Sequence, residues 1–171
     1  MRGYRVPSAA MLPTLPPGSH VTLALDPKYV PKVGDIVVFH PPAGAEAGGP
    51  ICGNRNQGGG HSQACDMPTA GESSLTFIKR IVAGPGDTLQ IVDGRAARNG
   101  HREQEPFIAP CGPDPLCNFR TPIKIPSGYY FVLGDNPGAS DDSRFWGPVR
   151  REWIIGKVVN IDRSGAQPTT T

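Results

Sequence analysis

Residues 77–82 read FIKRIV, and the turn-forming sequence GPGD follows at residues 84–87. Aromatic and β-branched residues dominate the first run, and glycine and proline end it, which predicts a β-strand followed by a turn. Because the side chains of a strand point alternately to its two faces, Phe77, Lys79 and Ile81 share one face. The strand therefore places a lysine between two large apolar residues on a side that would face the core. The alternative is a polar face that exposes Lys79 while Ile78 and Val82 point inward.

Short β-rich runs recur along the chain, as at residues 21–25, 35–39 and 129–133, with glycine and proline between them. The 22 glycines and 20 prolines make up about a quarter of the 171 residues, which approaches the composition of disordered chains. The clustering of the apolar residues argues against disorder, and the length suffices for one domain with a core. We therefore predict an all-β, mostly antiparallel domain with long loops.

The expected elements follow from these runs and from the turn residues between them. Asp93-Gly94 and Asn99-Gly100 are hairpin-turn dipeptides, so residues 88–103 should form a small meander. The other expected features are an extended, proline-rich opening at 1–19, strands near 20–26, 34–40, 76–82, 121–125, 129–134 and 156–161, and a return to the core at 143–149.

Charge and hydropathy exclude several classes of function. The net charge is +2 and the basic residues are spread singly, so we expect no nucleic-acid partner. No run of 18 apolar residues is present, so no segment should span a membrane. Residues 1–5 also lack the pattern of a signal peptide.

The four cysteines predict two disulfides. Four cysteines allow three pairings, and we favour Cys52–Cys65 and Cys111–Cys117, because these close local loops with twelve and five intervening residues. The competing interpretations are free buried thiols and a zinc site with His40 or His61 as a further ligand. Neither cysteine spacing is usual for zinc, so we predict no metal site.

Three further segments complete a set of motifs with FIKRIV. Along the chain, residues 7–15 read PSAAMLPTL, residues 31–35 read PKVGD before a β-rich run, and residues 134–144 read GDNPGASDDSR. In this order the segments resemble bacterial type I signal peptidases, whose boxes read P-S-x-S-M-x-P-T-L and G-D-N-R-x-x-S-x-D-S-R. The chain departs from the first box at Ala10, where the family has its reactive serine. It departs from the second at Pro137, which replaces an arginine.

The resemblance implies a Ser/Lys dyad protease with a signal-peptidase-like β-fold and no cofactor. Lys79 falls on the general base, and its burial would lower its pKa and supply the neutral amine that a base requires. With Ala10 at the nucleophile position, this chain should be catalytically dead. The family roles of the remaining residues would be the oxyanion hole for Ser8, orientation of the lysine amine for Ser140, and a structural ion pair for Asp142 and Arg144. Ser8 is not the expected nucleophile, because the reactive serine of the motif directly precedes Met11.

Signal peptidases cut after A-x-A sites, so the implied partners are the signal peptides of exported preproteins. The box positions that would line the pocket for the small side chains are Val6, Pro7, Met11, Leu15, Phe77 and Ile78, although each could instead belong to the core. Apolar residues 11–13 would suit contact with a membrane lipid surface. The implied location is the cell membrane, with the catalytic domain on the extracytoplasmic face and the membrane anchor absent from this chain.

The resemblance also suggests a division of the chain. We expect a single peptidase ectodomain with a catalytic core at about 1–40, 75–92 and 126–163, and a disordered tail at 164–171. A loop-rich insertion at about 41–74 would be stapled by Cys52 and Cys65, with a functional flap as the alternative. A small β excursion would occupy about 93–125. Three other functions stay open: a natural pseudoenzyme that binds signal peptides or partner proteins, a pilus-maturation peptidase, and an unrelated secreted β-domain.

Overall fold

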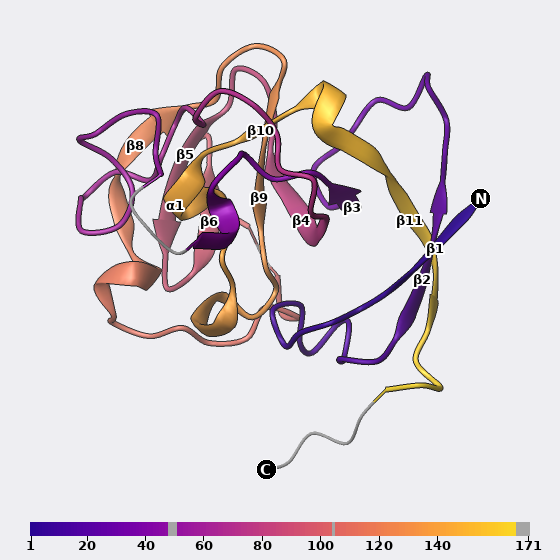
Figure 1. The fold of residues 1–171 in the computed structure, drawn as a ribbon. Coiled ribbons are helices and arrows are strands. Elements are labelled where there is room, and N and C mark those ends of the chain that lie inside the picture. The colour runs from indigo at the N-terminus through magenta and orange to yellow at the C-terminus, as the bar shows by residue number, and fades with distance from the viewer. Residues whose placement is uncertain (48–50, 104, 167–171) are drawn as a thin grey trace.

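The computed structural model describes residues 1–47, 51–103 and 105–166, and these form two antiparallel sheets with long loops (Figure 1). The predicted all-β fold class is confirmed. No helix among the described residues is both long and apolar enough to cross a membrane. The expected tail falls partly outside these residues, at 167–171, whereas residues 164–166 form a turn beside Gly18.

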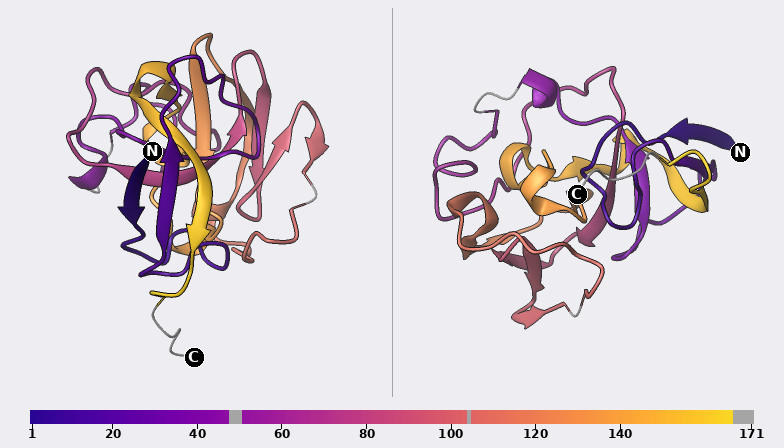
Figure 2. Two further views of the ribbon diagram at one scale, coloured as in Figure 1. Left: turned by 90° about the vertical axis from the view of Figure 1, so that its right-hand side faces the viewer. Right: turned by 90° about the horizontal axis from the view of Figure 1, so that it is seen from below.

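The larger sheet has seven strands in the order β1-β2-β11-β3-β4-β9-β10, with every neighbouring pair antiparallel. β11 lies between β2 and β3, and β1 pairs with the other edge of β2, so that β1, β2 and β11 form one side of the molecule (Figure 2). The strands are β1 (Arg2–Arg5), β2 (His20–Ala24), β3 (Ile36–Phe39), β4 (Phe77–Ala83), β9 (Tyr129–Leu133), β10 (Val149–Arg150) and β11 (Ile154–Asp162).

The smaller sheet has the order β7-β6-β5-β8, with β5 (Thr88–Val92), β6 (Arg95–Arg98), β7 (His101–Arg102) and β8 (Phe119–Lys124). Asp93 and Asn99 adopt φ of 54° and 55°, and a glycine follows each, as the predicted hairpin turns require. The chain was expected to leave the larger unit after residue 92, but β5 pairs with β6 and β8. The smaller sheet therefore begins at residue 88, because the turn at 84–87 redirects the chain before β5.

No strand was predicted where β1 lies, because residues 1–19 were expected only to form an extended, proline-rich opening. The four residues of β1, Arg-Gly-Tyr-Arg, carry little strand signal, and the strand forms by pairing with β2 from Arg2↔Leu23 to Arg5↔His20. Tertiary pairing therefore overrides a weak local preference.

Within the described residues, helical structure is confined to single turns in the connections. The 3₁₀ turns are η1 (Ala45–Ala47), η2 (Pro115–Cys117), η3 (Pro137–Ala139) and η4 (Arg151–Trp153), and the α-helical turn is α1 (Ser143–Trp146). The carboxylate of Asp142 caps α1 by accepting from the backbone N–H of Arg144, and Gly147 ends it at φ 88°. The expected return to the core at 143–149 is therefore made by α1, which buries Trp146, and by β10.

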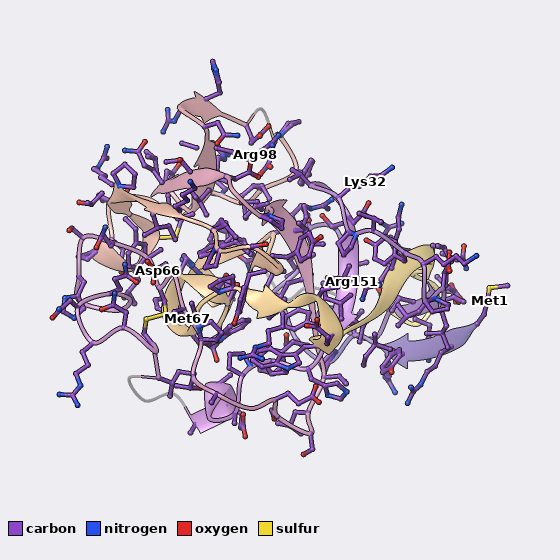
Figure 3. All side chains as sticks on the ribbon, turned by 90° about the horizontal axis from the view of Figure 1, so that it is seen from above. Met1, Lys32, Asp66, Met67, Arg98 and Arg151 are labelled. Atoms are coloured by element: carbon purple, nitrogen blue, oxygen red, sulfur yellow. A yellow bond between two sulfur atoms is a disulfide. The ribbon has the colours of Figure 1, made fainter. Side chains whose placement is uncertain are left out.

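The insertion at 41–74 folds back on itself and packs against α1. Bridges between Pro42 and Glu72 and between Cys52 and Pro68 join its two halves. The backbone N–H of Cys65 donates to the carbonyl of Arg144, which places the stapled loop against the helical turn. Asp66 and Met67, on this insertion, lie on the side of the molecule away from Met1 (Figure 3). Both predicted disulfides, Cys52–Cys65 and Cys111–Cys117, are present, so no cysteine is left for a metal.

Candidate active site

Lys79 lies at the centre of β4, between β3 and β9, and its side chain is buried with 6% of its surface exposed. Its Nζ lies 5.6 Å from the centroid of the Phe77 ring. Burial lowers the pKa of Lys79, and the nearby carboxylates of Asp142 and Asp141 oppose this by stabilising the ammonium form. Lys79 therefore lies on the buried face of β4, as the first of the two interpretations of the alternation predicted. Its burial favours the neutral amine.

Ala10 occupies a turn that the 134–144 loop fixes from one side. The backbone N–H of Asn136 donates to the carbonyl of Ala10 at 3.0 Å, and the Asn136 side-chain amide donates to the carbonyl of Ala9 at 3.0 Å. A Cβ on Gly134 would lie 2.6 Å from the Ala10 carbonyl oxygen and would collide with the Ser140 side chain. Glycine at position 134 is therefore what permits this close approach of the two segments.

Ser8 lies beside the backbone N–H of position 10. Its hydroxyl oxygen accepts a hydrogen bond from the Ala10 N–H at 3.4 Å, which is longer than a usual N–H···O bond. The two groups that the family resemblance assigns to the oxyanion hole are thus neighbours. If this long hydrogen bond is given up, the Ser8 hydroxyl and the Ala10 N–H can both donate to a substrate carbonyl.

Asp142 and Arg144 form the expected ion pair, and both side chains are almost completely buried. Arg144 Nε donates to Asp142 Oδ1 at 2.8 Å, and Arg144 also donates to the carbonyls of Pro137, Ser140 and Leu116. Because these bonds satisfy most of its donors, the arginine fixes the loop that precedes α1. Pro137, which departs from the family pattern, contributes its carbonyl to this network.

Ser140 does not donate its hydroxyl to Lys79. It donates to Asp142 Oδ2 at 2.8 Å, so the hydroxyl hydrogen points away and the oxygen lone pairs stay available. Such an oxygen can accept from the lysine ammonium but cannot donate to the neutral amine. The orientation role that the resemblance gives Ser140 therefore stays a prediction. In that role the Ser140 oxygen would accept a hydrogen bond from the lysine and would not donate one.

An ion pair between Arg80 and Asp135 was missed at the sequence level. Arg80 Nε and Nη2 donate to the two carboxylate oxygens of Asp135 at 2.8 and 2.7 Å, and the hydroxyl of Thr14 donates to the same carboxylate. Residue 80 belongs to the FIKRIV box, residue 135 to the GDN box and residue 14 to the first box. The bidentate pair therefore ties all three boxes together. The only sign of this pair in the sequence was that Arg80 and Asp135 are charged residues of two boxes to which no role had been assigned.

A cavity of about 350 Å³ joins these elements. It is lined by Ser8, Ala10 and Lys79, together with five of the six predicted pocket residues, namely Val6, Pro7, Met11, Phe77 and Ile78. The sixth, Leu15, does not line the cavity and is fully buried in the core cluster that contains Met11. Thr76, Ala139 and Asp141 also line the cavity, and none of them was predicted.

A buried lysine on the wall of a small apolar cavity, in a β-domain, has the layout of a peptidase site. The family model described as "Signal peptidase, peptidase S26" matches residues 1–161, and the chain belongs to this family.

Several known proteins are similar to this chain in sequence. Thylakoidal processing peptidase 1 of Arabidopsis thaliana is 37% identical over 158 residues, which cover 90% of this chain and 39% of that protein. Probable signal peptidase I-1 of Synechocystis sp. is 33% identical over 156 residues, or 90% of this chain and 67% of that protein. Signal peptidase I of Leptolyngbya laminosa is 34% identical, with 90% and 64% covered. The chain thus spans 39% to 67% of the length of these relatives.

Among solved structures, a signal peptidase I from Enterococcus faecalis V583 matches 77% of this chain and 98% of its own, with a TM-score of 0.48 and 22% identity.

Proposed function

We propose that this chain is the catalytic domain of an endopeptidase that removes signal peptides from exported preproteins after A-x-A-type sites, and that Ala10 makes it inactive. The observation that carries the proposal is the shared cavity of Ala10 and the buried Lys79, whose pKa is lowered by burial. Alanine at position 10 removes one oxygen and adds no bulk, so the binding cavity is retained while the nucleophile is absent.

With serine at position 10, the hydroxyl would attack the scissile carbonyl while neutral Lys79 accepts its proton. The Ser8 hydroxyl and the N–H of residue 10 would donate to the carbonyl oxygen as it gains negative charge; each such donor is worth roughly 3–4 kcal/mol. Lys79 would then give its proton to the leaving amine, and water would hydrolyse the acyl-enzyme. Ser140, held by Asp142, would accept from the lysine ammonium, and the ion pair of Asp142 and Arg144 would keep this loop in place.

The cavity also supports the proposed substrate class. Its volume of about 350 Å³ lies at the low end of ligand sites in proteins, and its walls are mostly apolar side chains. Such walls suit apolar residues like alanine. The two disulfides fit an extracytoplasmic location, where thiols are oxidised. We propose that the domain lies on the extracytoplasmic face of the cell membrane, next to the lipid surface where preproteins emerge.

The test is to restore the nucleophile with Ala10→Ser and to assay a preprotein with an A-x-A site in the presence of lipid or detergent. We expect cleavage after the second small residue, and on the order of 10⁶-fold less with alanine at position 10. Lys79→Ala on the restored background is the control and should abolish cleavage.

The second candidate function, a pseudoenzyme, is favoured by the intact cavity around Ala10. It predicts binding of a signal peptide to the parent chain and no cleavage by the folded Ala10→Ser variant. If that variant neither binds nor cleaves, the proposed function is wrong.

A further inference from the structure

A second cavity, of about 630 Å³, lies between the stapled insertion, α1 and η2. This volume falls within the roughly 300–1,000 Å³ of ligand sites in proteins. Its apolar walls include Leu116, Phe145 and Trp146, and its polar side includes Arg55 and His61. The cavity is therefore amphipathic, with Arg55 on the insertion and with apolar side chains on both the insertion (Ala45, Ile51) and the segments that face it.

The two cavities meet at Asp141, which lines both of them. One carboxylate oxygen of Asp141 accepts from Trp146 Nε1 at 3.1 Å, which fixes the side chain at the junction. The neighbouring residues, Ser140 and Asp142, belong to the hydrogen-bonded loop beside Lys79. A polypeptide that occupies the first cavity can thus continue past Asp141 into the second without leaving the surface of the domain.

The chemistry of the first cavity decides which part of the substrate enters the second. Its apolar walls suit the small residues that precede the scissile bond, so the chain that follows the bond must leave this cavity. The second cavity lies next to the first, because Asp141 lines both. The Cys52–Cys65 disulfide fixes the loop that carries Arg55, so the second cavity is framed before any substrate arrives.

The charges in the second cavity indicate which residues it prefers. Arg55 is exposed and takes part in none of the ion pairs among the described residues. His61 is exposed on the same insertion. An acidic side chain would complement the guanidinium of Arg55, whereas a basic one would meet like charge there. Asp141, which also lines the cavity, lies at its junction with the first cavity.

We propose that the second cavity binds the residues downstream of the scissile bond and that Arg55 selects an acidic side chain among them. The inference rests on the proposed function, because it names a further part of the same substrate. It assigns a role in substrate binding to the insertion at 41–74.

The experiment uses the chain with Ala10 in place, because it cannot cut the substrate. Two peptides with the same A-x-A site carry a benzophenone photo-cross-linker, one at the third residue before the site and the other at the third residue after it. The upstream probe should label residues 4–7 or 76–78, and the downstream probe should label residues 51–61, 116 or 145–146, as mapped by mass spectrometry.

The outcomes separate the two proposals. Upstream labelling as expected, with downstream labelling outside the second cavity, would overturn the inference and leave the proposed function standing. Labelling of the second cavity by the upstream probe would overturn the inference as well. If neither peptide gives labelling that excess unlabelled peptide suppresses, both proposals fail.

Charge reversal tests the selective residue. Binding is compared for two peptides that differ only in Glu or Lys at the third residue after the site. The parent should bind the Glu peptide about three- to fivefold more tightly, the range of an exposed ion pair, and Arg55→Glu should reverse the preference. Arg102→Glu is the matched control, because Arg102 is an exposed arginine on β7 that lines neither cavity. An unchanged preference in Arg55→Glu would rule out selection by Arg55.

Discussion

At the scale of single residues, Lys79 combines two opposing influences. Its burial favours the neutral amine, while Asp142 and Asp141 favour the ammonium and Arg144 disfavours it. Because burial is the largest of these influences, the pKa of Lys79 lies below its ordinary value of 10.5. Packing thus shifts Lys79 toward the neutral form that a base requires, and two carboxylates limit how far the pKa falls.

The first prediction concerns the stability of the fold. Between the lowered pKa of Lys79 in the folded state and its ordinary value, the unfolded chain binds more protons, so this residue destabilises the fold at neutral pH and less so as pH rises. Lys79→Met should therefore raise the free energy of unfolding by on the order of 1 kcal/mol at pH 7. Its advantage should shrink as pH rises toward 10.5 in urea unfolding series. An advantage that does not change with pH would contradict this account.

The second prediction concerns Asp141 in the restored enzyme, Ala10→Ser. In the proposed mechanism cleavage requires neutral Lys79, so kcat/KM should rise with pH through the pKa of this lysine. The Asp141 carboxylate raises that pKa, so Asp141→Asn should move the rising limb to lower pH. The measurement is the pH profile with a substrate that has no charged residue after the site. A limb that stays in place or moves to higher pH would show that Asp141 does not act on Lys79.

At the scale of elements, the 134–144 loop is held by one buried arginine. Arg144 joins the carboxylate of Asp142 to three backbone carbonyls, and the loop in turn contacts the carbonyl of Ala10 through Asn136. Positions 10 and 79 are therefore aligned by a loop that is far from both in sequence. The loop has little regular structure of its own, so its rigidity depends on these bonds.

The third prediction follows from this dependence. Arg144→Met should destabilise the fold by about 3–5 kcal/mol, because it leaves Asp142 buried without its partner. Arg144→Lys should recover only part of this loss, since an ammonium lacks the planar set of donors that reaches all the acceptors. Urea unfolding of both variants measures the effect. Equal stability of Arg144→Lys and the parent would show that charge alone, and not the fork of donors, holds the loop.

At the scale of the whole molecule, the insertion at 41–74 and the segment that carries the smaller sheet each contain one disulfide. The smaller sheet packs on β4 and β9 through a shared apolar cluster that includes Val82, Leu89 and Phe131. The insertion at 41–74 packs on α1 and frames the second cavity. Each unit also contacts Arg144: the carbonyl of Leu116 accepts from its guanidinium, and the backbone N–H of Cys65 donates to its carbonyl.

The fourth prediction compares the two disulfides. The stabilisation from a disulfide grows with the length of the loop that it closes, and Cys52–Cys65 closes the longer one, with a sequence separation of 13 against 6. Replacing both cysteines of the pair by serine should reduce the free energy of unfolding by about 3 kcal/mol for Cys52–Cys65 and by about 2 kcal/mol for Cys111–Cys117. Urea unfolding under oxidising conditions measures both. A larger loss for the shorter loop would show that packing around the bond, not loop closure, dominates.

The sequence by itself determined the features that depend on local pattern. Strand positions follow from runs of β-branched residues between turns, the burial of Lys79 from alternation along β4, and the disulfides from the short loops that they close. Each of these depends on neighbours within one element or one loop. Even Gly94 and Gly100 were recognised from dipeptides, because a positive φ is a property of the turn alone.

The tertiary structure alone decided which distant segments meet. The bidentate pair of Arg80 and Asp135 and the exclusion of Leu15 from the cavity depend on segments that are far apart in sequence. So does the junction of the two cavities at Asp141. The physical reason is that long-range contacts are fixed by the joint packing of several elements, and no local period or turn signal encodes that packing.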